Sequence, residues 1–262
     1  NVFAMNAQLS YDTILARAHR YGTTDFDSAE YYYLLQNEEA IKRGEQDKML
    51  DSRIFLCTYY TMIDRYEDAR VLFSEIWDLD MDTVYRVELG NSYATVLNHF
   101  DRNKADSIYR ETVAYAEGYS GKLDNRASLF SNYALFLVGR GRLYEGATYF
   151  EKALVNPFSE YQKFLTLNSL CTVFTSVNNW TLVEEYVNQA IEISERNGYK
   201  ARNGNVATNY ARLLMAQGKL EHARQEISRA MRFTPFVKAD DFYINLFSVR
   251  SQYYMKAYHW DS

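Results

Sequence analysis

The sequence predicts an all-α fold made of repeated helix–turn–helix units, and three observations support this prediction. First, the chain has only two prolines, which suits long helices because proline removes a backbone donor and breaks a helix. Second, apolar residues recur at helical spacing. Third, an anchor position that is usually a small residue returns every 36 to 41 residues, at Ala29, Ala69, Ala105, Gly146, Val183 and Ala223.

A helix is predicted to begin near each anchor. An apolar or aromatic side chain lies three residues before most anchors, and another lies four residues after each of them. In the fourth unit these residues are Leu143 and Phe150. Spacings of three, four and seven residues place side chains on one face of an α-helix. The second helix of each unit is therefore predicted to bury this face.

The first helix of a unit is predicted by two similar stretches, NYALFLVGRGRLYEG at 132–146 and NYARLLMAQGKLEHA at 209–223. In each stretch a large residue and then a small one lie on a helical face well before the anchor. Four units have a turn-forming residue between the two helices. These residues tolerate the left-handed backbone that ends a helix, and they are Asp64, Gly141, Asn178 and Gly218.

This pattern resembles the tetratricopeptide repeat, a family with a large and a small residue on its first helix, a turn glycine, and an alanine on its second helix. The resemblance implies a right-handed α-solenoid, a superhelix of about thirteen helices in antiparallel pairs. It places units at 9–43, 50–78, 86–117, 127–157, 164–197 and 204–235. The steps exceed the family's usual length of about 34 residues, and they resemble long variants found in bacterial regulatory proteins.

The chain is predicted to be a single repeat domain over 1–262 that ends in a half-unit at 239–262. The expected next anchor falls one residue past the end, and the last predicted helix is apolar on several faces, whereas a terminal cap should present a polar face. We therefore expect a fragment of a longer protein. The alternative is a half-unit that serves as a native cap.

Composition excludes several classes of function. The net charge is −5 and no block of Lys and Arg occurs, so direct nucleic-acid binding is not expected. No apolar run is long enough to span a membrane. The chain begins at Asn1 rather than Met, which fits a cytoplasmic protein trimmed at its end and also a periplasmic protein that has lost a signal peptide.

The sequence predicts neither catalysis nor a cofactor or metal site. None of the four histidines forms a zinc-binding motif. Cys57 and Cys171 occupy the small-residue position of the first helix, where packing explains them better than nucleophilic chemistry. An enzyme would need convergent carboxylates or a histidine pair in the groove, and the groove positions supply neither.

The resemblance implies that the first helices line a concave groove that binds a peptide or a partner protein. The side chains predicted to face this groove are Ser131, Asn168, Thr172, Asn205, Thr208 and Arg212. Asn and Thr can hydrogen-bond an extended backbone, and Arg212 can pair with an acidic group. The alternative is a solvated inner face without a ligand.

Two functions follow from this interpretation. The first is a non-catalytic scaffold that binds a protein or peptide in the groove. The second is a sensory or regulatory module of a longer bacterial signalling protein or transcription regulator, with an effector domain beyond residue 262.

Overall fold

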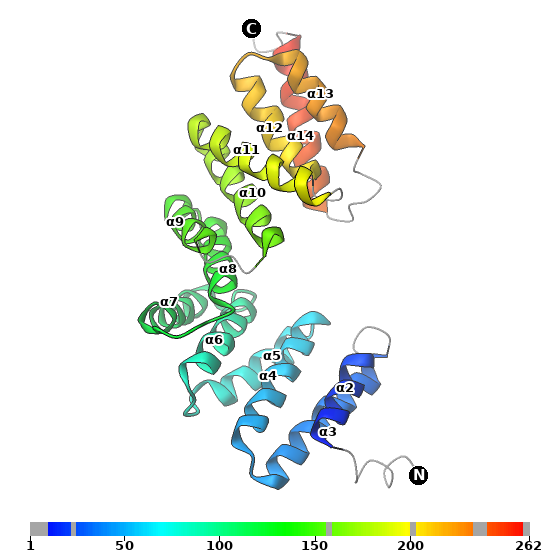
Figure 1. The fold of residues 1–262 in the computed structure, drawn as a ribbon, viewed down its shortest axis with the longest axis vertical. Coiled ribbons are helices and arrows are strands. Elements are labelled where there is room, and N and C mark those ends of the chain that lie inside the picture. Colours follow the sequence, from blue (N-terminus) through cyan, green and yellow to red (C-terminus); the bar gives the residue numbers. More distant parts are fainter. Residues whose placement is uncertain (1–9, 22–24, 156–158, 200–202, 233–239, 259–262) are drawn as a thin grey trace. The chain divides into compact units, whose positions relative to one another are not determined.

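The computed structural model describes residues 10–21, 25–155, 159–199, 203–232 and 240–258, and the regular secondary structure within these ranges is entirely α-helical (Figure 1). The backbone divides into two compact units, Asn1–Leu123 and Asp124–Ser262. The described part of the chain contains thirteen helices, so the predicted all-α solenoid of about thirteen helices is confirmed. That 1–262 forms a single repeat domain stays a prediction.

The first compact unit contains three helix pairs. Its helices are α2 (Tyr11–Tyr21), α3 (Phe26–Arg43), α4 (Gln46–Met62), α5 (Tyr66–Trp77), α6 (Thr83–Leu97) and α7 (Arg102–Gly118). The second compact unit contains three further pairs and a last single helix. Its helices are α8 (Arg126–Gly139), α9 (Leu143–Leu154), α10 (Glu160–Ser176), α11 (Trp180–Asn197), α12 (Asn203–Ala216), α13 (Leu220–Met231) and α14 (Asp240–Ala257).

The second helix of every pair begins three residues before its anchor, as the apolar spacing predicts. These first residues are Phe26, Tyr66, Arg102, Leu143, Trp180 and Leu220. All six anchors are buried, which confirms the predicted inward face. One member of the pattern differs. The Phe26 side chain is 54% exposed, although the Tyr59 hydroxyl of α4 donates to the Phe26 backbone carbonyl at 3.0 Å.

The four predicted turn residues all adopt left-handed backbone. Their φ angles are 60° for Asp64, 77° for Gly141, 55° for Asn178 and 73° for Gly218. In this conformation the residue after the first helix reverses the chain direction and lets the second helix fold back. The prediction of a tight turn at each of these positions is confirmed.

Gly141 offers a matched test of this turn geometry, because Gly139 lies two residues away at the end of α8 with right-handed backbone. A Cβ atom would meet nothing within 4 Å at either position. We expect Gly141→Ala to lower the free energy of unfolding by about 1–2 kcal/mol, the cost of left-handed backbone for a residue with a side chain. Gly139→Ala should leave it unchanged or raise it by up to about 1 kcal/mol. Urea unfolding followed by circular dichroism measures both, and equal effects would contradict this account.

The core of the second compact unit lies between its helix pairs. Phe150 of α9 packs with Phe164, Leu167 and Leu170 of α10 in one buried cluster. A second cluster joins α12, α13 and α14. Cys171 is 1% exposed, and burial raises the pKa of its thiol to about 12. Such a thiol stays protonated near neutral pH, which agrees with the packing role predicted for it.

Within this unit the first helices of successive pairs are neighbours. Helix α12 contacts α10 on one side and α14 on the other. The three helices, coloured green to red in Figure 1, therefore form one layer. We call the surface formed by these three helices the α10–α12–α14 face.

Candidate peptide-binding groove

Amide side chains connect α10 to α12. The Asn209 Nδ2 atom donates a hydrogen bond to Asn168 Oδ1 at 3.0 Å and lies 3.3 Å from Thr172 Oγ1. Asn209 is 1% exposed. The buried Nδ2 group is thus paired, as buried donors in proteins usually are, while the Asn209 Oδ1 atom is buried without a hydrogen-bond partner among the described residues. The hydrogen bond from Asn209 to Asn168 links two successive repeats of the chain.

A second polar connection joins α12 to α14. The Arg212 guanidinium donates to Asn245 Oδ1 at 2.6 Å, and Asn245 Nδ2 donates to Thr208 Oγ1 at 3.2 Å. Asn245 therefore bridges two side chains of α12 that lie one turn apart. Since a charge-assisted hydrogen bond is among the stronger ones in proteins, this bridge holds the guanidinium in a defined place on the α10–α12–α14 face.

An open pocket with a volume of about 510 Å³ lies on this face. Its polar lining from α10 includes Thr172 and Thr175, and the aromatic ring of Trp180 forms part of its wall. The cationic side chains of Arg212 and Lys256 also line it. Among the described residues, no Asp, Glu or His contributes to the lining. The pocket can therefore offer positive charge and hydrogen-bond donors, but it offers no general base.

Arg212 keeps its charge although it is half-buried. Burial lowers the pKa of its guanidinium from the usual value. An arginine nevertheless remains protonated in proteins, because its pKa lies far above neutral pH. Its only hydrogen bond within the described residues goes to the neutral amide of Asn245. The guanidinium has five N–H donors, so most of them have no hydrogen-bond partner among the described residues.

The structure brings some of the predicted groove residues together and leaves others apart. Thr172 and Arg212 line the pocket, and Asn168 lies beside it in the amide connection. Thr208 is fully buried, so its hydroxyl supports Asn245 from beneath. The backbone carbonyl of Asn205 accepts the Thr208 hydroxyl. Ser131 lies on α8, away from the pocket, and its buried hydroxyl has no partner within the described residues.

The sequence prediction did not include Asn245, Gln252 or Lys256, all on α14. A signal for them was present. Adding the 40-residue step to Asn205 and Arg212 gives Asn245 and Gln252. One helical turn beyond Gln252 lies Lys256, which is the same position as Ala216 on α12. The groove pattern therefore predicts these three residues if it is continued into the half-unit and by one further turn along each first helix.

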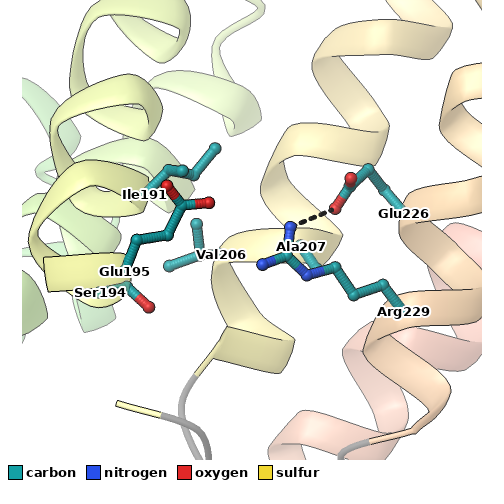
Figure 2. Close-up of a pocket in the computed structure, with 7 residues that line it drawn as sticks. All are labelled: Ile191, Ser194, Glu195, Val206, Ala207, Glu226 and Arg229. Atoms are coloured by element: carbon teal, nitrogen blue, oxygen red, sulfur yellow. Dashed lines mark ion pairs between the residues drawn. The ribbon is translucent and has the colours of Figure 1, made fainter. Parts of the chain in front are cut away.

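A second cavity lies between α11, α12 and α13, and Figure 2 shows its lining. The Arg229 guanidinium lies 3.8 Å from a Glu226 carboxylate oxygen, and burial raises the pKa of that carboxyl. The Ser194 hydroxyl is buried without a hydrogen-bond partner among the described residues. The volume of about 10 Å³ admits at most one water molecule, which the Ser194 hydroxyl could bind. This cavity is too small for a ligand.

The described residues contain no group of three or more His, Cys, Asp and Glu side chains placed to hold a metal ion. Over the same ranges, none of the helices has the length and the apolar character needed to cross a membrane.

No protein-family model and no curated protein match the sequence, whereas many solved structures resemble the fold. The apo form of RapI is 14% identical, with a TM-score of 0.72 over 92% of this chain and 71% of that chain. The pilF protein of Pseudomonas aeruginosa is 18% identical, with a TM-score of 0.60 over 81% and 90%. YrrB, described as a TPR protein with an unusual peptide-binding site, is 12% identical, with a TM-score of 0.57 over 82% and 97%.

The fold defines the class of the protein. The described chain is an all-α solenoid with the fold of tetratricopeptide-repeat proteins, and this agrees with the resemblance found in the sequence. At these levels of identity the likeness concerns the fold alone. What the chain binds must be argued from its own side chains.

Proposed function

We propose that the protein is a non-catalytic scaffold that binds a peptide or an extended segment of a partner protein on its α10–α12–α14 face. The observation that carries the proposal is the open pocket of about 510 Å³ on this face. Sites for small ligands and peptides are concave and combine apolar walls with a few placed polar groups. Here Trp180 and Met215 supply the wall, and Thr172, Arg212 and Asn245 supply the polar groups.

The chemistry of the face suits an extended backbone. Hydroxyl and amide side chains both donate and accept hydrogen bonds, so they can pair with the alternating N–H and C=O groups of a peptide. The connections of Asn168 to Asn209 and of Asn245 to Arg212 hold these groups before a ligand arrives. Such preorganisation reduces the ordering cost of binding.

Display of random linear peptides on phage, selected against the full chain, tests the proposal with defined ligands. Gln252→Trp should weaken binding of the selected peptides about tenfold or more, because Gln252 is exposed, lines the pocket and makes its only described side-chain hydrogen bond to Ser248. A bulky indole at this position fills the pocket. Fluorescence anisotropy of labelled peptides gives the dissociation constants.

The matched control is Gln225→Trp, the same substitution at an exposed position of α13 outside the pocket. This variant should bind the selected peptides as the wild type does. If no peptide is selected above background, or if both tryptophan variants bind equally well, the α10–α12–α14 face does not carry the binding function.

A further inference from the structure

The pocket on the α10–α12–α14 face carries an excess of positive charge. Arg212 and Lys256 both line it, and the described residues add no acidic side chain to the lining. Several other arginines of this unit are paired with carboxylates. Arg142 lies 2.6 Å from Glu145, Arg224 lies 2.7 Å from Glu221, and Arg229 lies 3.8 Å from Glu226. Arg212 and Lys256, in contrast, have no carboxylate partner among the described residues.

The contacts of the two cations leave most of their donors open. Arg212 donates to the amide oxygen of Asn245, which carries no charge. The Lys256 ammonium lies 3.5 Å from the Met215 carbonyl oxygen, the long limit of a hydrogen bond, and has two further donors. An anionic ligand would accept hydrogen bonds from both cations.

We infer that the pocket binds the carboxylate side chain of an acidic residue in the partner peptide, held between Arg212 and Lys256. This inference rests on the proposed function and narrows its ligand class. The planar guanidinium can form two parallel hydrogen bonds with a carboxylate, while Lys256 adds a second charge from α14. Asn245 is then a positioning residue, because it acts through Arg212.

A peptide fits these observations better than a nucleic acid. Binding along a phosphate backbone requires a row of cations, since each phosphate contact contributes only a part of the affinity. The described pocket has two cations, and the chain as a whole has a net charge of −5. Two cations in a pocket with an aromatic wall match one or two carboxylates on a short segment.

The test uses the peptides selected on phage against the full chain. We expect them to be enriched in Asp and Glu. Replacing those residues with Asn and Gln in synthetic peptides with blocked termini should weaken binding about tenfold or more. Arg212→Gln and Lys256→Gln should each weaken the binding of the acidic peptide, but not that of its amide version, and added NaCl should weaken only the former.

The control is Arg224→Gln, which removes the same charge from an exposed position of α13 outside the pocket, and it should bind the acidic peptide as the wild type does. Circular dichroism verifies that every variant is folded. Selection of neutral peptides that Gln252→Trp rejects would overturn the carboxylate inference while supporting the proposed function. Equal loss of acidic-peptide binding in Arg224→Gln would overturn it as well, because the attraction would then be non-specific. Selection of no peptide would overturn the proposed function itself.

Discussion

Replacing Phe150 with alanine should lower the free energy of unfolding by about 3–5 kcal/mol, the largest effect that we expect from a single substitution in this chain. The Phe150 side chain is 1% exposed and lies in the buried cluster that joins α9 to α10. Truncation removes apolar area from the core and leaves a cavity that the fixed helices around it cannot fill. Natural domains are stable by about 5–15 kcal/mol, so the variant should lose a large part of its stability.

Tyr144→Ala is the control for this result, because it removes an aromatic ring from the same helix at a side chain that is 68% exposed. It should change the free energy of unfolding by less than about 0.5 kcal/mol. Urea unfolding followed by circular dichroism gives both values, and amide hydrogen exchange should place the loss of protection in α8–α11. A Phe150→Ala variant as stable as Tyr144→Ala would contradict the packing described for this core.

The second large effect is expected at Gly90, in the other compact unit. A Cβ atom at Gly90 of α6 would lie 2.0 Å from Thr112 Oγ1 of α7, which is far inside contact distance. Thr112 is fully buried and its hydroxyl is bonded to the Ile108 carbonyl at 2.7 Å. The side chain therefore has no room to move away. Gly90→Ala should lower the free energy of unfolding by about 1–3 kcal/mol through overpacking.

Thr112→Ala in the Gly90→Ala background should restore much of the lost stability, because it removes the two nearest atoms of the clash. Thermal and urea unfolding of the two single variants and the double variant form a cycle whose coupling energy measures this contact. Gly118→Ala serves as the control, since a Cβ atom there would meet nothing within 4 Å. Strictly additive effects of the Gly90 and Thr112 substitutions would show that the two helices do not approach as closely as described.

Much of the fold could be predicted from the sequence because its signals are local. A left-handed turn needs a residue that tolerates positive φ, so Asp64, Gly141, Asn178 and Gly218 mark four turns by their chemistry alone. The start of each second helix follows from the spacing around the anchor. The burial of a side chain is harder to predict, because it depends on residues that are distant in the sequence. The same spacing marks Phe26 as a core residue, yet it is mostly exposed, because burial depends on what packs against the first turn of α3.

The candidate site was harder to predict for the same reason. Spacing within a repeat identifies Arg212 and Thr172, which both line the pocket. Spacing does not tell which side chains of neighbouring helices meet. Whether Thr208 faces a ligand or lies beneath Asn245 depends on how α12 packs against α14, and contacts between residues 37 positions apart decide this. The positive charge of the pocket likewise depends on packing, because Lys256 of α14 and Arg212 of α12 line the same pocket.

The hydrogen bond between Asn245 and Arg212 affects how the binding specificity of a repeat protein can evolve. The side chain proposed to touch the partner belongs to one repeat, while the side chain that orients it belongs to the next. Exchanging or inserting a single repeat would separate the two. New binding preferences should therefore arise by paired substitutions across a repeat boundary, and alanine scanning of one repeat at a time should give non-additive effects.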